Sequence, residues 1–550
     1  MSSIDNMTLR EKIGQTAVFR HHIIERIDDY DKYFEENPVG FTWLMSHPKE
    51  IYKKLEASMG NPELIGTKED FFTDYINKIN EHSSVPVMPV CDASQGIPAG
   101  MFEGHPTLPT AAGVGATNDP ALAYEYGKIL GEDLYNLGYR WLWSPVVDNA
   151  GVFRGTRSFG CDTETVNKLA IAFIKGVQDS GVATGAKHFP GQDPYEDRDP
   201  HFCSAAYSQS FEYWQSTQAK NFQACIDAGV DSIMIGHKTF RAVDDTFING
   251  SLVPSTISYN VITKLLKEKM GFKGVVVSDD ISMKALMAVM PKEKLYIALL
   301  NAGIDAVLGP LDLDYIDIVE KAVLNGEVSE ERINDACSRI LKMKEKYGFK
   351  KGEKLVAPTE ESKKIICEKA TEFSEKVASK GLTLTANHLN FQPLSKENIR
   401  KVKIFYIGYS EVCFNNLQYM VDEFKKYGAE CEVKEGYAPS DNNTLKDYDL
   451  IIYATYIGMH APRGGPHFYG EKCSMLWDVM TVEREKSVAV SFGDPDIYFN
   501  YFSAAPTFVN CYNLNKETMV GFVRGLYGDN QFTDFAPFPL NRITRTNEIY

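Results

Sequence analysis

The sequence predicts an α/β protein in which an N-terminal TIM-like (β/α)8 barrel is followed by a smaller doubly wound α/β sandwich domain. With 550 residues the chain exceeds what one typical core holds. Short apolar strands alternate with amphipathic helices, which indicates a parallel sheet. The alternation starts again after a charged stretch. We therefore expect the barrel over 1–352, a linker and helix over 353–380, and the sandwich domain over 381–550.

The first domain offers short apolar runs as candidate strands, at 42–47, 86–93, 139–148, 182–189, 231–237, 274–280 and 305–310. Helical runs at 120–138 and 166–181 place apolar residues at three- and four-residue spacing and stop at a glycine. Seven or eight such units over about 300 residues favour a barrel over an open sheet. A barrel places its chemistry at the C-terminal ends of its strands.

The second domain follows a capped amphipathic helix at 330–348 and the charged linker. After a further helix at about 361–379, its candidate strands lie at 381–386, 402–408, 449–455, 486–493 and 506–512. This pattern predicts an open, doubly wound sheet.

Composition excludes several classes of protein. A net charge of −16 argues against nucleic acid or an anionic membrane as the main partner. The ten cysteines include no CxxC pair, so free thiols are expected, and zinc-knuckle and redox spacings are absent. No apolar leader opens the chain and no stretch has the apolar length of a membrane span. We expect a cytoplasmic protein. Composition does not give the oligomeric state, for which a monomer or homodimer is the expectation.

Polar side chains cluster where the candidate barrel strands end. They are Asp92, Asp148, Lys187 with His188, His237, and Asp279 with Asp280. Polar residues naturally follow apolar strands as loops begin, but this accounts for one or two cases better than for five. The clustering favours a functional site at this end of the barrel.

The run GFKGVVVSDDISM (271–283) is a buried type of strand that delivers two carboxylates. Because strand side chains alternate, Asp279 and Asp280 cannot both point inward. One could serve as a nucleophile or a base. The other is expected to cap the next helix or to bind locally. A helix N-cap is also the commoner explanation for such a pair taken alone.

In RDPHF, proline restricts Asp199 to extended conformations, and residues i and i+2 of an extended chain project to the same side. The Asp199 carboxylate can then reach the ring of His201, fix its tautomer and favour its protonated form. A lone Asp-x-His is more often a surface coincidence. A metal is a third interpretation, but no further ligand cluster supports it.

Two basic segments complete the candidate site. Lys187 and His188 could form structural salt bridges, or could donate hydrogen bonds to sugar hydroxyls at a barrel mouth. Arg157, in RGTRSFG (154–160), has the same two interpretations.

Together these segments resemble glycoside hydrolase family 3, and within it the bacterial β-N-acetylglucosaminidase subfamily. The resemblance covers nearly the whole chain. Its specific part is KHFPG (187–191) followed by Asp-x-His, and its other matching segments are 7–15, 115–148, 157–160, 253–286, 326–348, 381–394 and 491–502.

The resemblance implies a retaining glycosidase that acts through a covalent intermediate on β-linked GlcNAc oligosaccharides or glycosides. It implies Asp279 as the nucleophile and His201 as the acid/base, with Asp199 as its partner. It implies sugar binding by Asp92, Arg157, Lys187 and His188, and no metal or cofactor. The loop KHFPGQDPYEDRDPH departs from the family pattern by one inserted residue, and Gly100 stands near the place of an arginine that normally touches the sugar.

Other functions fit the same scaffold. A histidine acid/base carries less negative charge than a glutamate, so phosphate could replace water in a phosphorylase. A β-glucosidase or β-xylosidase is a further alternative, which the Asp-x-His loop disfavours. The altered loop also admits a catalytically silent sugar-binding protein, against which the retained Asp279, Asp199 and His201 argue.

Overall fold

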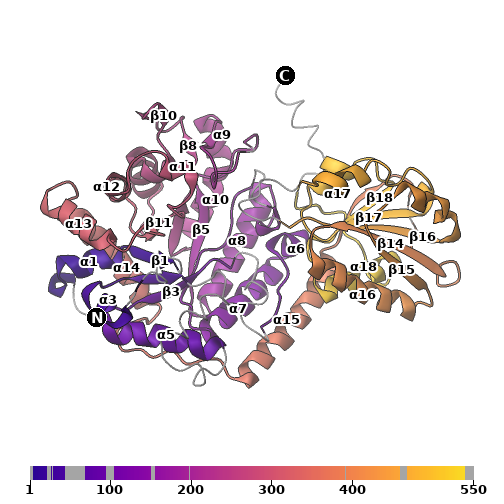
Figure 1. Cartoon of the computed structure of the whole chain (residues 1–550), viewed down its shortest axis with the longest axis horizontal. Helices are drawn as coiled ribbons and strands as arrows, with labels where there is room; N and C mark the ends of the chain where they lie inside the picture. Colours follow the sequence, from indigo (N-terminus) through magenta and orange to yellow (C-terminus); the bar gives the residue numbers. More distant parts are fainter. Residues whose placement is uncertain are drawn as a thin grey trace. The chain divides into compact units, whose positions relative to one another are not determined.

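The computed structural model describes residues 4–20, 27, 29–43, 68–93, 105–149, 155–196, 198–390, 392–458 and 467–538. The chain divides into two compact units (Figure 1). The first comprises residues 1–106, 127–151 and 170–367, and the second comprises 107–126, 152–169 and 368–550. The expected domain boundaries at 352 and 380 stay a prediction.

Eight parallel strands of the first unit follow one another around a barrel in chain order. They are β1 (Ala17–Arg20), β2 (Phe41–Trp43), β3 (Met88–Cys91), β4 (Trp141–Leu142), β5 (Ala183–Phe189), β7 (Ser232–Ile235), β11 (Val275–Ser278) and β12 (Val307–Leu308). A parallel bridge between Val277 and Ala306 joins the two outermost strands and closes the ring. The strands are almost wholly buried, because side chains fill the barrel and helices cover it.

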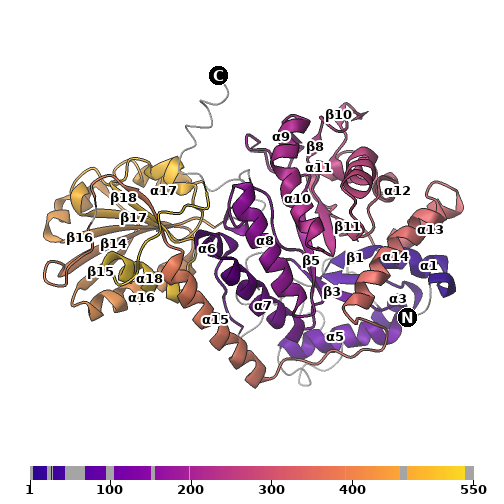
Figure 2. The ribbon, with the colours of Figure 1, turned by 180° about the vertical axis from the view of Figure 1, so that it is seen from behind.

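Helices of the same unit surround these strands. They are α1 (Leu9–Gln15), α3 (Tyr30–Glu36), α5 (Lys68–His82), α9 (Phe211–Ser216), α10 (Gln218–Asp227), the π-helix η5 (Asn260–Lys269), α11 (Lys284–Met287), α12 (Lys292–Ala302), α13 (Tyr315–Leu324) and α14 (Glu330–Lys346). Figure 2 shows α1, α13 and α14 side by side, where the last helix of the barrel meets the first. Thr8 caps α1 with a capping box and Ser329 caps α14, which fixes where both helices begin.

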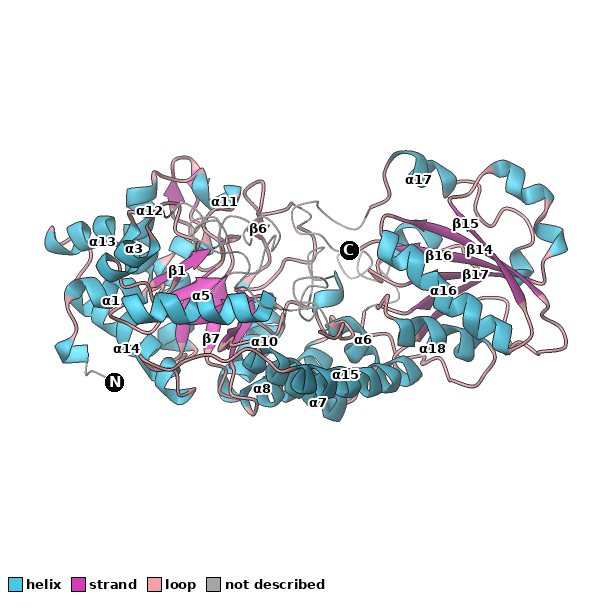
Figure 3. Cartoon of the chain, turned by 60° about the horizontal axis from the view of Figure 1, so that its bottom comes forward, coloured by secondary structure: helices cyan, strands magenta, loops and turns pink. Residues whose placement is uncertain are grey.

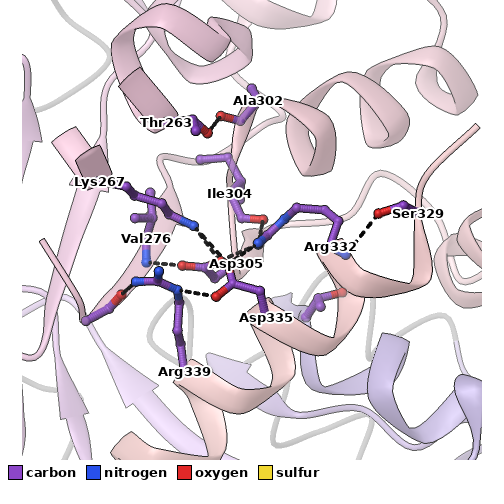
Figure 4. Close-up of polar contacts among 12 residues, drawn as sticks. Thr263, Lys267, Val276, Ala302, Ile304, Asp305, Ser329, Arg332, Asp335 and Arg339 are labelled. Atoms are coloured by element: carbon purple, nitrogen blue, oxygen red, sulfur yellow. Dashed lines mark hydrogen bonds and ion pairs between the residues drawn. The ribbon is translucent and has the colours of Figure 1, made fainter. Parts of the chain in front are cut away.

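A buried ion cluster ties the last β/α units together (Figure 4). Asp305 is fully buried and accepts hydrogen bonds from Lys267 Nζ at 2.8 Å and the backbone N–H of Val276 at 2.9 Å. The Arg332 guanidinium pairs with both Asp305 and Asp335. Burial lowers the pKa of Lys267 to about 8, although the charge of Asp305 opposes this. The cluster joins η5, β11, β12 and α14 through one carboxylate.

The second unit contains a six-stranded sheet in the order β13-β18-β17-β16-β14-β15, parallel except at its β13 edge (Figure 3). Its strands are β13 (Thr383–Asn387), β14 (Lys401–Gly408), β15 (Glu430–Glu435), β16 (Leu450–Tyr456), β17 (Ser487–Ser491) and β18 (Thr507–Asn510). The neighbouring helices α16 (Glu411–Lys426) and α18 (Lys516–Leu526) pack on one face around Ile404, Ile452 and Val490. The other face buries Phe405, Tyr453 and Phe508.

Shorter elements complete this unit, and three helices run across the ranges of both units. α6 (Ala111–Ala116), η3 (Gly155–Arg157), α17 (Gly470–Met475) and the π-helix η9 (Tyr498–Phe502) belong to the second unit. α7 (Pro120–Asn136), α8 (Thr163–Gln178) and α15 (Glu360–Lys380) carry residues of both.

The predicted fold class is confirmed. The sequence prediction missed one strand of the barrel and one of the six-stranded sheet, besides four two-residue strands outside these sheets. β1 follows α1 with one residue between them, so no separate apolar run marks it. β15, with the sequence ECEVKE, is an edge strand whose side chains are mostly solvent-accessible. All ten cysteines are free thiols. Among the described residues, no helix combines the length and the apolar composition needed to cross a membrane.

Candidate active site at the carboxyl end of the barrel

Three neighbouring strands, β3, β4 and β5, bring four of the strand-end residues into contact. Lys187, at the end of β5, has a buried side chain whose Nζ lies 2.7 Å from Oδ1 of Asp92, just after β3. His188 Nδ1 lies 2.8 Å from Oδ2 of the buried Asp148, which follows β4. The His188 backbone N–H donates to the other Asp148 oxygen at 3.2 Å. Asp148 therefore holds both the ring and the backbone of His188.

This pairing determines which ring nitrogen of His188 a ligand can use. A carboxylate accepts hydrogen bonds only, so Nδ1 carries the proton that it shares with Asp148. Nε2 is the nitrogen that this contact leaves for a ligand. Lys187 likewise has a fixed ammonium, because its stem is buried in the strand.

Asp279 follows β11 and keeps part of its surface solvent-accessible, although protein surrounds it closely. Burial alone would raise its pKa, but the charges of His188, His237, His201 and Lys187 outweigh this and hold the pKa below its ordinary value. Asp279 is thus ionised at neutral pH. Its Oδ1 accepts the N–H of the next residue at 2.8 Å, and its own N–H donates to Ile235 O at 2.9 Å.

His237, at the end of β7, is buried beneath this carboxylate region. Burial lowers its pKa to about 4, so the ring is neutral at pH 7. Nε2 lies 2.8 Å from the Asp280 carbonyl oxygen and must carry the proton. Nδ1 lies 2.6 Å from the Thr256 hydroxyl oxygen, which also lies 2.9 Å from the Gly236 carbonyl oxygen.

The carboxylate of Asp280 has a structural role. It pairs with Arg20 at the end of β1 and accepts the N–H of Ser282 at 2.9 Å. The Arg20 guanidinium lies 4.7 Å from the ring centroid of Trp43, at the end of β2. Asp280 therefore binds Arg20 and Ser282 and does not cap the next helix, whose N-cap is Met283. Its neighbour Asp279 is the carboxylate left for chemistry.

Asp199 and His201 are in contact on the loop that follows β5. Asp199 Oδ1 accepts from the His201 backbone N–H at 2.9 Å and from the ring Nδ1 at 2.7 Å. Asp199 is buried, whereas the His201 side chain is 36% exposed. Nε2 of His201 is therefore a solvent-accessible nitrogen that can give or accept a proton, on a ring oriented by a carboxylate.

The loop is attached to the segment after Asp279. The backbone N–H of Lys284 donates to His201 O at 3.1 Å, and that of Ala285 donates to Pro200 O at 3.2 Å. The loop that carries Asp199 and His201 is thereby joined to the segment that follows Asp279.

Two acidic residues brace the other part of this loop. Asp193 is fully buried and accepts from the Ser208 N–H at 2.6 Å and the Tyr195 N–H at 2.8 Å. Glu196 accepts from Arg198 and from the Ala206 N–H at 2.9 Å. Burial would raise the Glu196 pKa, but these hydrogen bonds lower it to about 2.

Of the residues proposed from the sequence, Asp92, Lys187, His188, Asp199, His201 and Asp279 all lie in the first unit at strand ends or on the loop after β5. Arg157 ends the short helix η3 in the second unit, and sugar binding by it stays a prediction. Gly100 lies outside the described residues. Within the described part of the chain, no group of three or more His, Cys, Asp or Glu side chains could hold a metal ion.

Three residues of the site were missed as site residues from the sequence. Asp148 and His237 stand at strand ends, and that position was the signal that could have assigned them. Arg20 ends a strand that went unrecognised, and its contact with Asp280 joins positions far apart in the chain. No local pattern reports such a contact.

The arrangement supplies what a double displacement at an acetal carbon needs. An ionised carboxylate can attack, and a histidine–aspartate pair can protonate a leaving group and then deprotonate water. The paired Lys187 and Asp92, with His188, offer donors and acceptors suited to hydroxyl groups.

Comparisons with known proteins agree with this chemistry. A β-N-acetylglucosaminidase/β-glucosidase of Cellulomonas fimi is 29% identical over 431 residues, 74% of this chain and 76% of that protein. A β-hexosaminidase of Xylella fastidiosa strain M23 is 31% identical over 238 residues, 42% of this chain and 69% of that protein.

Solved structures share the fold. A glycoside hydrolase family 3 β-N-acetylglucosaminidase of Paenibacillus sp. superposes with a TM-score of 0.77 at 22% identity, covering 97% of this chain and 99% of that one. A β-glucoside phosphorylase superposes with a TM-score of 0.80 at 19% identity, covering 98% and 94%. The sequence model of the glycosyl hydrolase family 3 N-terminal domain matches residues 8–343. The chain belongs to glycosyl hydrolase family 3.

Proposed function

We propose that the protein is a retaining β-N-acetylglucosaminidase that removes β-linked GlcNAc from oligosaccharides or glycosides. The observation that carries this proposal is the Asp199–His201 pair, bonded at 2.7 Å and attached through its backbone to the segment after Asp279. The charge of His201 acts on Asp279, which supports a proton donor and an ionised carboxylate working in one site. The names of the similar proteins from Cellulomonas fimi and Xylella fastidiosa support the same sugar.

In the proposed reaction, Asp279 attacks the anomeric carbon and forms a glycosyl–enzyme ester. His201 gives its Nε2 proton to the departing oxygen, and Asp199 stabilises the ring through Nδ1. His201 then takes a proton from the water that hydrolyses the ester, so the product keeps the β configuration. The low pKa of Asp279 suits this role, since the nucleophile must be ionised.

The remaining residues are proposed to bind the sugar. Lys187 and Asp92, held together at 2.7 Å, present a fixed donor and a fixed acceptor to neighbouring hydroxyl groups. His188 offers Nε2 from a ring fixed by Asp148. Arg157 is proposed as a further donor to the sugar.

The first test is release of p-nitrophenol from the aryl β-N-acetylglucosaminide and, in parallel, from the aryl β-glucoside, each with and without inorganic phosphate. We expect a clear preference for the acetamido sugar and no dependence on phosphate. Activity on the glucoside alone would indicate that a residue other than His201 is the acid/base. A rate that requires phosphate would mark a phosphorylase.

Variants assign the nucleophile in the same assay. Asp279→Asn should lower kcat at least about a thousandfold, because the amide cannot form the ester. Asp245→Asn, at an exposed aspartate of the same unit, is the matched control and should keep wild-type activity. Equal activity of the two variants would exclude Asp279 as the nucleophile.

A further inference from the structure

One basic side chain near the site is buried without a hydrogen-bond partner. Lys238 is 3% exposed, and among the described residues its Nζ has no acceptor. An ammonium group out of water is costly unless negative charge or hydrogen bonds replace its hydration. If the side chain only had to fill volume, methionine would do so without this cost. The buried lysine therefore calls for an electrostatic explanation.

The backbone places Lys238 where the loop carrying His201 returns to the barrel. Its carbonyl accepts from the Ser255 N–H at 3.0 Å and the Ser255 hydroxyl at 2.6 Å, which fixes its position. The next residue, Thr239, donates its N–H to Ala205 O at 3.0 Å. Strand β8 (Thr239–Phe240) then pairs with β6 (Ala206–Tyr207), the strand that ends the loop.

Three carboxylates supply the charge that the buried ammonium requires. Burial lowers the Lys238 pKa, and the charges of Asp148, Glu196 and Asp193 oppose that effect. Asp193 and Glu196 are the acids that brace the loop, and Asp148 holds His188. Arg198 pairs with Glu196 from the exposed side, and its charge adds to the lowering of the Lys238 pKa. Lys238 is the buried cation among these acids, and without it the carboxylates would repel one another in a region of low dielectric constant.

We propose that Lys238 is a positioning residue for proton transfer: its ammonium offsets the charge of Asp193, Glu196 and Asp148 and so holds the His201 loop in its working position. The inference rests on the proposed function. Lys238 need not touch the substrate, because it acts through the loop acids.

The test compares Lys238→Met and Lys238→Arg on two GlcNAc glycosides, one with a dinitrophenyl leaving group and one with an unactivated sugar leaving group. A dinitrophenolate departs without a proton, whereas an alkoxide needs the acid. For Lys238→Met, kcat/KM should fall at least about tenfold more on the unactivated glycoside than on the dinitrophenyl one. The upper limit of this difference is the factor of about 10²–10⁴ that a general acid supplies. Lys238→Arg, which keeps the charge, should recover most of that loss.

Lys264→Met removes an exposed lysine of η5 and should leave both rates unchanged. Should Lys238→Met fail to fold, Lys238→Gln carries the same comparison with a polar neutral side chain. Equal losses of kcat/KM on both substrates would overturn this inference but not the proposed function. An arginine variant no more active than the methionine variant would do the same. A wild-type protein silent on both glycosides would overturn the proposed function and this inference with it.

Discussion

Acidification should destabilise the barrel through one buried histidine. His237 has a folded-state pKa of about 4, against 6.5 for the ordinary side chain. As the pH falls below 6.5, the unfolded chain binds a proton that the folded chain refuses until about pH 4. The stability that the neutral His237 ring contributes to the folded barrel is therefore fully present above pH 6.5. It is lost as the pH falls from 6.5 to 4. The difference of about 2.5 in pKa corresponds to about 3 kcal/mol at pH 4.

Tryptophan fluorescence reports on the unit that contains His237. Trp141, Trp143 and Trp214 are buried in the first unit, whereas Trp477 of the second is 88% exposed and should change little on unfolding. Urea unfolding followed by this signal, at pH 7 and pH 4, gives the loss of stability of the barrel. A chain of two units need not unfold in one step, so a probe selective for the barrel is needed.

The control is His237→Gln, whose amide can still donate to the Asp280 carbonyl and has no proton to gain. Apart from Asp279, whose pKa the charge of His237 helps to lower, carboxylates titrate alike in both proteins. The difference between the two losses therefore reports on the histidine and its interaction with Asp279. We expect the wild type to lose about 3 kcal/mol more than the variant. Equal losses would refute the argument, because they would mean that His237 titrates in the folded barrel as it does in water.

Other predictions concern stability and geometry. Asp305→Asn should lower the free energy of unfolding by about 3 kcal/mol in the same fluorescence experiment, because it leaves the buried cations Lys267 and Arg332 undercompensated; a loss below about 1 kcal/mol would contradict this. Gly309→Ala should cost both stability and kcat, because φ is +71° and the new Cβ would lie 2.8 Å from the carboxylate beside the proposed nucleophile. Gly326→Ala, at φ +76° in open space, shares the backbone cost and should keep full kcat; equal kcat in the two variants would exclude the contact as the cause.

The parts of the site that the sequence predicted are those fixed by short-range geometry. Asp199 and His201 are two residues apart around a proline, so their contact follows from extended backbone alone. Asp279 and Asp280 alternate on a strand, so their division between chemistry and structure was expected. Strand ends also predicted where the remaining side chains would gather.

What the sequence could not predict depends on which strands become neighbours. Lys187 pairs with Asp92 because β5, β4 and β3 are adjacent, and Arg20 reaches Asp280 across the closed barrel. The burial of Lys238 follows from a loop that folds back on β8, which no periodicity reports. The same limit applies to β15, because an edge strand needs no apolar run.

The most direct test of the proposed mechanism is mass spectrometry of the His201→Gln variant during turnover of a dinitrophenyl β-N-acetylglucosaminide. The activated leaving group departs without an acid, and the missing base then slows hydrolysis of the ester. We expect a covalent N-acetylhexosamine on the peptide that contains Asp279. Turnover with no adduct, or an adduct on another residue, would contradict the assignment of Asp279 as the nucleophile and His201 as the acid/base.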